Sequence, residues 1–381
     1  MADGGAARVG VAAEDRVLDL TAATRLLLPE HAALFAGGTL DALLAAGRGT
    51  WREVHAAVAG WLADRVSVRA LEPFLVPAGD VTMRLPFTVV DYVDFYASEH
   101  HATNVGRIFR PGAEPLAPSW RHMPLGYHGR AGTVVVSGTP VARPRGQRRT
   151  DDGVVFGPSQ RLDVEAELGF VVGMPSRLGK PVALDAFADH VFGVCVVNDW
   201  SARDVQSWET VPLGPFLGKS FATSVSPWVV PLEALAHARV SPSPRASRLL
   251  PYLDDTGSGA QPWGLDIDFV VRLNGHVVSR PPFSSMYWTG AQMLAHLTSN
   301  GASLRTGDLF ASGTVSGPAP DQRGSLLELS WGGEEPLQLP DGTARTFLED
   351  GDEVVITATA PGVGGGRVAL GEVRGRVLAA R

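Results

Sequence analysis

The residues of this chain that are best suited to chemistry are acids in three separate segments. In the stretch LDVEAELGF, Asp163, Glu165 and Glu167 alternate with apolar residues. This period of two predicts a strand with one acidic face, with Asp163 at its frayed edge. Asp199 follows the apolar run VCVVN, and Asp94 lies in the segment DYVDFYASEHH. A divalent cation removes the repulsion among gathered carboxylates, and their hard oxygens suit Ca²⁺, Mg²⁺ or Mn²⁺.

The alternative to a metal site is an exposed strand face. In that case the acids would pair with the many arginines of the chain at the surface, where ion pairs contribute little stability. The presence of further acids at Asp94 and Asp199, with no lysine near them in the sequence, favours the metal site.

His101 is the candidate general base, because histidine exchanges protons near neutral pH. If DFYASEHHATN is helical, His101 lies two turns from Asp94 on one face, near the metal without binding it. Glu328 is a single acid in the apolar run SLLELSW, which predicts a strand. A buried acid needs a partner, and orienting His101 would supply one. A structural role for this histidine is the open alternative.

Donors for a developing negative charge follow Asp199. The segment NDWSARDVQSWE predicts the end of a buried strand and the start of a helix. On that helix Arg203 and Gln206 lie three residues apart, on the same side as Asp199. Lys219 and Lys180 are the only lysines among 33 basic residues. A compact ammonium suits a site where guanidinium geometry does not fit, so Lys219 is a candidate catalytic residue.

Composition bounds the class of protein. The 381 residues are 45% hydrophobic and 19% charged, with a formal net charge of −7, which is typical of a globular protein and predicts a cytoplasmic one. An acidic chain without basic runs argues against a nucleic-acid partner. No apolar stretch reaches the roughly 20 residues that span a membrane, and no signal-peptide pattern is present. The single cysteine, Cys195, excludes an intrachain disulfide.

The elements that must position these residues indicate a fold that is mostly β with α (α+β). Residues 1–85 contain a predicted strand pair, RVGVAAEDRVLDL, and two predicted helices, TLDALLAAG and TWREVHAAVAGWLADRV, the second capped at Thr50. Residues 86–381 contain many short strand-like runs, among them GTVVVSG, HVFGVCVVND, DIDFVVRLNGHVVS, GSLLELSW and DEVVITATA. Residues 240–262 predict an extended surface loop. The sequence thus predicts a small N-terminal domain and a large mixed-sheet domain.

Six segments together resemble the fumarylacetoacetate hydrolase family. They are DFYASEHHATNVGRIFRPG, WRHMPLGYHGRAGTVVVSGTPVARPRGQ, EAELGFVVG, NDWSARDVQSWE, VPLGPFLGKSFATSVSPWVVP and GTVSGP. The resemblance runs from about residue 85 to the end of the chain, with weaker support before it. NDWSARD indicates the wider superfamily. FYASEHHATN and YHGR indicate the branch that hydrolyses 4-fumarylacetoacetate to fumarate and acetoacetate in tyrosine and phenylalanine breakdown.

The resemblance implies an SH3-like barrel in residues 1–85, a mixed β-roll in residues 86–381 and a homodimer. It implies a catalytic Ca²⁺ ion, or Mg²⁺ or Mn²⁺ in its place, held by Asp94, Glu165, Glu167 and Asp199. It also implies a second site, for Mg²⁺, framed by Asp199, Lys219 and Thr223. The implied catalytic residues are His101, Glu328, Lys219, Arg203 and Gln206. The implied substrate-binding residues are Tyr96, Arg110, Tyr127, Gln206, Thr210 and Thr314.

One position departs from the family pattern. Thr210 stands where the family has a tyrosine, which would weaken binding of the far end of the β-diketo acid substrate or admit a bulkier acyl group. Two alternatives stay open. An acylpyruvate hydrolase or β-keto-acid decarboxylase on the same fold would usually lack the long N-terminal region and the FYASEHHATN block. A non-catalytic metal-binding protein would keep the acids without the base, and His101 with Glu328 counts against it.

Overall fold

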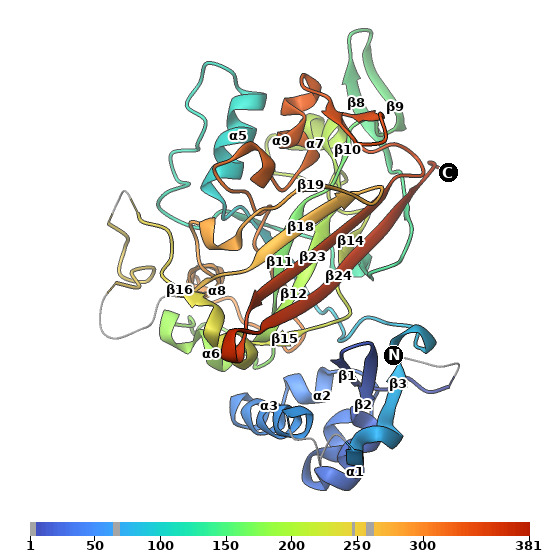
Figure 1. Cartoon of the computed structure of the whole chain (residues 1–381). Helices are drawn as coiled ribbons and strands as arrows, with labels where there is room; N and C mark the ends of the chain where they lie inside the picture. Colours follow the sequence, from blue (N-terminus) through green and yellow to red (C-terminus); the bar gives the residue numbers. More distant parts are fainter. Residues whose placement is uncertain (1–4, 64–68, 246–247, 257–262) are drawn as a thin grey trace.

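The apolar runs form two large β-sheets in the computed structural model of the chain (Figure 1). The structure describes residues 5–63, 69–245, 248–256 and 263–381. The first sheet has the order β5-β4-β20-β11-β12-β14-β6, with β15 paired to β12. Its strands are β4 Tyr92–Phe95, β5 Gly126–His128, β6 Val134–Val136, β11 Ala166–Val172, β12 Val191–Asp199, β14 Thr223–Val225, β15 Val230–Pro231 and β20 Leu309–Ala311. Because β4 runs parallel to β20 and β6 parallel to β14, whereas β11 and β12 are antiparallel, the sheet is mixed, as predicted.

The second sheet has the order β19-β18-β23-β24-β7. Its strands are β7 Val141–Ala142, β18 Asp268–Leu273, β19 His276–Ser279, β23 Glu353–Pro361 and β24 Arg367–Leu378. Between β18 and β19, Asn274 and Gly275 have φ of 51° and 83°, the conformation that an Asn-Gly pair supplies at a tight hairpin. Phe170 of β11 and Ile356 of β23 belong to one buried core, so the two sheets pack on each other.

Short helices and ribbons connect the sheets. The helices of this part are α5 Glu99–Phe109, α6 Phe187–His190, α7 Arg203–Glu209, α8 Gly290–Thr298 and α9 Leu326–Leu329. The ribbons are β8 Arg145–Thr150 with β9 Gly153–Pro158, β10 Leu162–Asp163 with β13 Ser201–Ala202, β16 Arg239–Val240 with β17 Gly264–Leu265, and β21 Leu337–Gln338 with β22 Ala344–Arg345. The described residues between 241 and 256 form no helix or strand, as the loop prediction expected. Val240, where the predicted loop begins, instead ends β16, and residues 246–247 and 257–262 lie outside the described residues.

The strand predicted for GSLLELSW is wrong, because this segment forms the helical turn α9. The Ser325 hydroxyl precedes the turn and accepts a hydrogen bond from the Glu328 amide at 3.3 Å. Serine three residues before glutamate is a helix-start signal. It outweighs the short apolar run, whose pattern does not separate a buried strand from a buried helical turn.

The N-terminal residues form the smaller part of the molecule, at the bottom of Figure 1. Its elements are β1 Gly10–Ala13, β2 Arg16–Asp19, α1 Leu20–Leu27, α2 Asp41–Leu44, α3 Arg48–Ala63 and β3 Leu75–Pro77. The strands form an antiparallel sheet in the order β1-β2-β3. The predicted strand pair and both predicted helices are confirmed. However, α3 begins at Arg48, so Thr50 lies inside its first turn and does not cap it, and the predicted helix residues 64–66 lie outside the described residues.

This N-terminal part packs on one face of the first sheet. Trp51 of α3 is only 1% exposed, and its ring lies 5.5 Å from Phe192 of β12 and nearly perpendicular to it. Cys195 and Val197 of β12 belong to the same apolar cluster. Since alternate strand residues share a face, this cluster lies on the face of β12 that also carries Asp199. The N-terminal part therefore covers the apolar end of the face whose other end is acidic.

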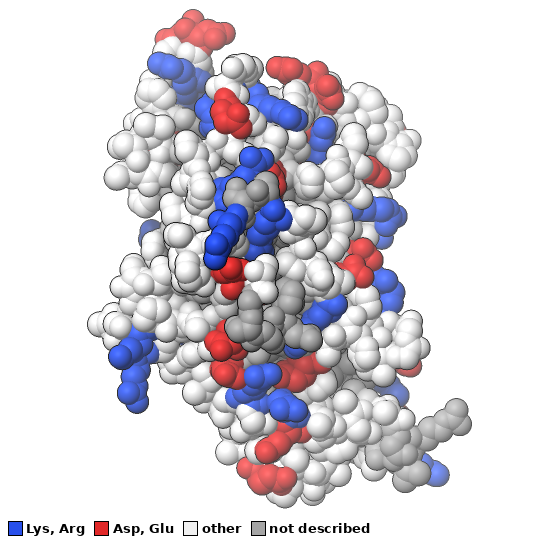
Figure 2. All heavy atoms as spheres, turned by 90° about the vertical axis from the view of Figure 1, so that its left-hand side faces the viewer, with Lys and Arg blue, Asp and Glu red and all other residues white. Residues whose placement is uncertain are grey.

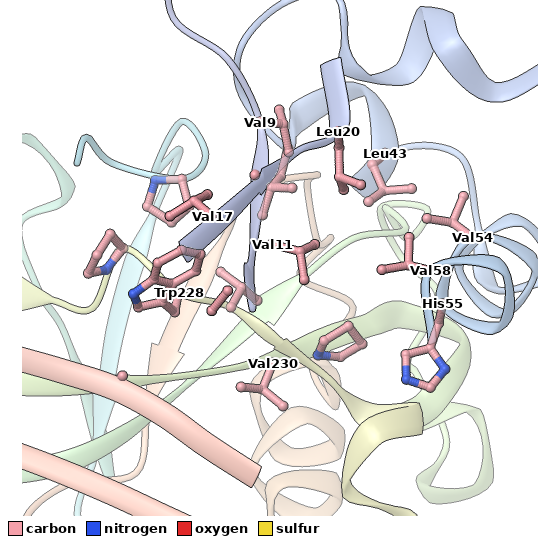
Figure 3. Close-up of a pocket in the computed structure, with 18 of the residues that line it drawn as sticks. Val9, Val11, Val17, Leu20, Leu43, Val54, His55, Val58, Trp228 and Val230 are labelled. Atoms are coloured by element: carbon pink, nitrogen blue, oxygen red, sulfur yellow. The ribbon is translucent and has the colours of Figure 1, made fainter. Parts of the chain in front are cut away.

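An apolar cavity of about 410 Å³ lies at the junction of the two parts (Figure 3). Val11 and Val17 of the N-terminal sheet and Val58 of α3 line it on one side, and Trp228 and Val230 line it on the other. None of the predicted site residues lines this cavity. It is thus a gap in the packing between the parts and separate from the acidic cluster.

The surface agrees with the mildly acidic composition. On the face shown in Figure 2, acidic and basic side chains are interspersed over a largely uncharged surface, with one group of basic side chains near its centre. Within the described ranges, no helix is long and apolar enough to cross a membrane.

Trp51→Ala is expected to lower the free energy of unfolding by about 3–5 kcal/mol, because it removes the buried ring that joins α3 to β12. Urea denaturation followed by circular dichroism measures the loss. Trp208→Ala is the matched control: its ring is 39% exposed, so its loss should stay under about 1 kcal/mol. Equal losses in the two variants would contradict the packing described here.

Candidate metal centre and active site

Four carboxylates meet because of how the strands of the first sheet pair. β4 pairs with β20, β20 with β11 and β11 with β12, which brings Asp94, Glu167 and Asp199 onto one face. Glu165 lies just before β11, in a bridge to Ser325. One carboxylate oxygen from each of the four acids lies within 4.8 Å of the others, and all four residues are buried. The predicted ligand set is thus brought together, although its members lie far apart in the sequence.

The acidic stretch is not one continuous strand. β10 ends at Asp163 and β11 begins at Ala166, so Glu165 lies between the two strands. Asp163 is not frayed, as the alternation suggested, but completely buried. Its carboxylate accepts a hydrogen bond from Arg203 Nε at 2.8 Å. The Arg203 guanidinium, which the sequence placed on the same side as Asp199 as a donor for substrate, explains why an acid is stable here.

Two cationic side chains face the four carboxylates. Lys219 Nζ donates to Asp199 Oδ2 at 2.8 Å and also contacts Glu165. Arg203 donates from its other side to Glu165 Oε1 at 2.5 Å. Although burial raises the pKa of Glu165, these two cations together hold it below its ordinary value. Two positive charges do not balance four ionised carboxylates, so ionising all four requires further positive charge, which a divalent cation would supply.

Asp94 and Glu167 are the acids that these cations do not satisfy. Burial and then Asp199 raise the pKa of Asp94 to about 8. Burial and then Asp94 raise the pKa of Glu167 well above its ordinary value. Neither carboxylate oxygen of Glu167 has a hydrogen-bond partner among the described residues, which is rare for buried polar atoms. These two oxygens, gathered with three other acids, fit a bound divalent cation with hard oxygen ligands.

Tyr127 of β5 closes the cluster on one side. Its hydroxyl lies 3.0 Å from Asp94 Oδ2 and 2.8 Å from Asp199 Oδ2, and it can donate to only one of them at a time. Burial and then Asp199 raise the pKa of Tyr127 well above its ordinary value. The phenol therefore stays protonated and serves as a hydrogen-bond donor inside the site.

His101 of α5 lies at the edge of the acidic cluster with its tautomer fixed. Its Nδ1 is 2.6 Å from Glu328 Oε2, and Asn104 and two serine hydroxyls also donate to this carboxylate. Burial raises the pKa of Glu328, but His101 and these donors together lower it below its ordinary value. An ionised carboxylate only accepts, so we assign the ring hydrogen to Nδ1, which leaves Nε2 as the free base. Nε2 lies 3.9 Å from Glu165 Oε1.

The prediction that Asp94 and His101 lie two turns apart on one face of a helix is wrong. Asp94 lies in β4, whereas α5 begins at Glu99. Ser98 caps α5 and its hydroxyl accepts a hydrogen bond from the His101 amide at 3.2 Å. The strand, the cap and the first turn of the helix together place the imidazole, and a cap between the two residues breaks any common helix face.

Arg203 and Gln206 share a face of α7, as predicted, and Arg203 donates to Gln206 Oε1 at 3.1 Å. Asp199 does not lie on this helix, because β12 ends at Asp199 and α7 begins at Arg203. The Asp199 carboxylate is held instead by Lys219, Tyr127 and the Thr223 hydroxyl, the last at 2.9 Å. Asp199, Lys219 and Thr223 thus lie together. Whether they frame a second ion site stays a prediction.

The residues predicted to bind substrate divide into two groups. The rings of Tyr96 and His101 pack nearly perpendicular to each other, with centroids 5.4 Å apart. Thr314 is buried, and its hydroxyl has no partner among the described residues. By contrast, Arg110 is exposed and donates to the Pro115 carbonyl. The Thr210 hydroxyl donates to the Gln206 carbonyl at 2.6 Å, where α7 ends.

Sequence reasoning missed one residue of the site and misjudged another. Asn104 donates to Glu328 Oε1 at 2.9 Å, and its place three residues after His101, one helical turn on, was the available signal. Asp163 was noticed but assigned to a frayed edge. No local pattern identified its partner, because Arg203 lies forty residues further along the chain.

Comparisons with known proteins agree with this geometry. The model described as Fumarylacetoacetate (FAA) hydrolase C-terminal matches residues 91–378, and the model Fumarylacetoacetase N-terminal matches residues 2–86. Fumarylacetoacetases of Homo sapiens and Rattus norvegicus are 45% and 46% identical to this chain, over 98% of it and 92% of their own length. The fumarylacetoacetase of Oryza sativa subsp. japonica is 43% identical, over 98% of this chain and 90% of its own length.

Solved structures show the same fold at lower identity. A fumarylacetoacetate hydrolase from Exiguobacterium antarcticum has a TM-score of 0.54 at 18% identity, covering 99% of this chain and 97% of its own. A maleylpyruvate hydrolase from Sphingobium sp. SYK-6, in complex with manganese(II) and pyruvate, has a TM-score of 0.54 at 15% identity, covering 98% and 97%. The mixed sheet and the buried acids thus define a protein that shares the fold of these two structures and has a site suited to a divalent metal. More narrowly, the chain belongs to the fumarylacetoacetase family.

Glu167→Gln is expected to weaken metal binding and stabilise the protein in the presence of chelator. The amide removes the carboxylate charge at this position, which the three neighbouring acids repel. The free energy of unfolding at pH 8 should therefore rise by about 1 kcal/mol or more. Because the pKa of Glu167 is raised in the folded protein from its ordinary value of 4.5, the wild type loses stability as the pH rises above 4.5. The stability that Glu167→Gln gains over the wild type should therefore be smaller at pH 5 than at pH 8.

Urea denaturation at both pH values measures the stability change, and titration calorimetry with Ca²⁺ and Mg²⁺ measures affinity, which should fall about tenfold or more. Glu335→Gln, at an exposed residue, is the matched control and should change neither quantity. Unchanged metal affinity in Glu167→Gln, or a loss of stability with chelator present, would contradict the assignment.

Proposed function

We propose that this chain hydrolyses the carbon–carbon bond of 4-fumarylacetoacetate to give fumarate and acetoacetate, as in tyrosine and phenylalanine breakdown. The observation that carries the proposal is His101, which Glu328 holds at 2.6 Å beside a cluster of four buried carboxylates. The relatives that match nearly the whole chain are fumarylacetoacetases, which supports this substrate over others handled by the same fold.

His101 removes the proton from the attacking water through Nε2. Glu328 stabilises the imidazolium that forms, because its carboxylate already accepts the hydrogen on Nδ1. The hydroxide adds to the carbonyl carbon next to the bond that breaks. When that bond breaks, its electron pair leaves with the acetoacetate carbon, which then takes a proton. Fumarate keeps the oxygen that came from water.

The ion held by Asp94, Glu165, Glu167 and Asp199 is proposed to be Ca²⁺, Mg²⁺ or Mn²⁺. When bound, it would supply positive charge to neighbouring oxygens of a β-diketone. Within the chain itself, the Tyr127 hydroxyl lies within hydrogen-bond distance of both Asp94 and Asp199 and donates to one of them at a time.

Lys219, Arg203 and Gln206 are proposed to stabilise the negative charge that develops on the carbonyl oxygen and on the leaving carbon. Lys219 contacts two carboxylates, which leaves one of its three N–H groups for substrate. Arg203 uses three of its five N–H groups on Asp163, Glu165 and Gln206. Two N–H groups remain, and the loss of one such donor typically costs about 10²–10³ in rate.

The substrate-binding assignments extend this proposal outward. The Thr314 hydroxyl has no partner among the described residues, and the amide of the preceding Gly313 donates to Asp94 at 3.1 Å. The ring of Tyr96 packs against that of His101. Both observations support contact with substrate. Arg110 and Thr210 are proposed for the far end of the substrate. We also propose the second ion, Mg²⁺, at Asp199, Lys219 and Thr223, and a cytoplasmic homodimer.

The direct test follows the absorbance of the diketone when purified protein is mixed with 4-fumarylacetoacetate and Ca²⁺ or Mg²⁺. We expect turnover that stops when a chelator is added and returns with the metal. Turnover of acylpyruvates in place of 4-fumarylacetoacetate would support the acylpyruvate hydrolase alternative. Metal binding without turnover of either substrate would support a non-catalytic protein.

His101→Ala is expected to reduce turnover about 10²–10⁴-fold, because the general base is lost, with metal affinity within threefold of the wild type. His100→Ala is the matched control. This neighbour on α5 is only half-buried and, in the described part of the chain, forms no hydrogen bond with Glu328. It should keep turnover within about threefold. Equal losses in the two variants would contradict a base role for His101.

A further inference from the structure

We infer that Asp163 is a positioning residue that fixes the Arg203 guanidinium and the His101–Glu328 pair relative to each other. The inference rests on the proposed function, and it concerns a residue outside the predicted catalytic, substrate-binding and metal-binding sets. Asp163 ends the short strand β10, and it is completely buried although it carries a carboxylate.

One side of the Asp163 carboxylate holds Arg203. Oδ2 accepts from Arg203 Nε at 2.8 Å. The same guanidinium donates from its two ends to Glu165 Oε1 at 2.5 Å and to Gln206 Oε1 at 3.1 Å. Because the guanidinium is planar, fixing Nε fixes the directions of the N–H groups that remain for substrate.

The other contacts of Asp163 hold the turn α9. Oδ1 accepts from the Leu326 amide at 2.7 Å and Oδ2 from the Leu327 amide at 3.2 Å. These amides open α9 and have no partner within so short a helix. The next residue is Glu328, whose carboxylate orients the His101 ring. A shift of α9 therefore moves the partner of the base.

A single charge thus links the Arg203 guanidinium on α7 with the turn α9 that carries Glu328. The Val164 amide adds a further donor to Oδ1 at 2.8 Å, so the carboxylate accepts four hydrogen bonds, one of them from a cation. An ionised carboxylate accepts on both oxygens and donates from neither, whereas a protonated carboxyl group or an amide presents a donor at one of the two positions. An amide at this place would turn one NH₂ group toward Arg203 or toward the α9 amides, where only donors lie.

The experiment compares the steady-state kinetics of Asp163→Asn with the wild type on 4-fumarylacetoacetate. The expected result is a fall in kcat of about 10–100-fold, typical for residues that orient a catalytic group, with KM within threefold. Asp204→Asn is the matched control. Asp204 lies next to Arg203 and accepts from Ser159 and the Gln160 amide, but among the described residues it forms no hydrogen bond with Arg203 or α9. It should keep kcat within threefold.

Double variants separate positioning from a general loss of stability. If Asp163 acts through Glu328 and Arg203, the loss caused by Asp163→Asn should be smaller in a Glu328→Gln background and in an Arg203→Lys background than in the wild type. A purely structural role would give the same loss in all three backgrounds, because independent effects add. That result, or wild-type kcat in Asp163→Asn, or an equal loss in Asp204→Asn, would overturn the inference.

A second variant covers the case in which Asp163→Asn does not fold. Asp163→Glu keeps the charge but lengthens the side chain by one methylene, so kcat should fall at least threefold with KM unchanged, and an unchanged kcat would overturn the inference. Wild-type turnover is measured first. Its absence would contradict the proposed function, whereas wild-type turnover alongside unimpaired Asp163 variants would contradict only the positioning role.

Discussion

The structure depends on burying a group of carboxylates within 4.8 Å of one another. Charges of one sign in a region of low dielectric constant repel strongly, and among the described residues the buried cations that contact these acids are Lys219 and Arg203. Other features of the site respond to this constraint. Tyr127 stays protonated, Asp94 has a raised pKa, and Glu167 retains two oxygens without a donor. The same shortage of positive charge is what makes the site suited to a divalent cation.

The two faces of the first sheet have different roles, because one forms the main core and the other carries the acidic site. One face packs against the second sheet in a continuous core. The other face is apolar where Trp51 and its neighbours cover it and acidic where the strands end. The repulsive group is therefore placed on a scaffold that is stabilised elsewhere, and α5, α7 and α9 add the base, the guanidinium and the carboxylate that orients the base.

Much of this could be predicted from local patterns. The period of two in LDVEAELGF indicated the acidic face, and the hardness of the ligands indicated the kind of metal. The need of a buried acid for a partner indicated the pairing of Glu328 with His101, even though the element that carries Glu328 was assigned wrongly. The partners of Asp163 and Arg203 could not be predicted, because they depend on how β10, α7 and α9 meet in space. The sequence showed that Thr210 departs from the tyrosine of the family pattern. Only the structure shows that its hydroxyl donates to the Gln206 carbonyl at the end of α7.

The register of β11 against β12, in which Glu167 faces Val197, limits how the length of this chain can change. Sliding either strand by one residue would exchange the two faces, so that carboxylates would enter the hydrophobic interior and valines would line the polar centre. Insertions and deletions between these strands are thus tolerable only when they leave that pairing intact. Natural variation in chain length is expected in the connecting loops and not inside the strands themselves.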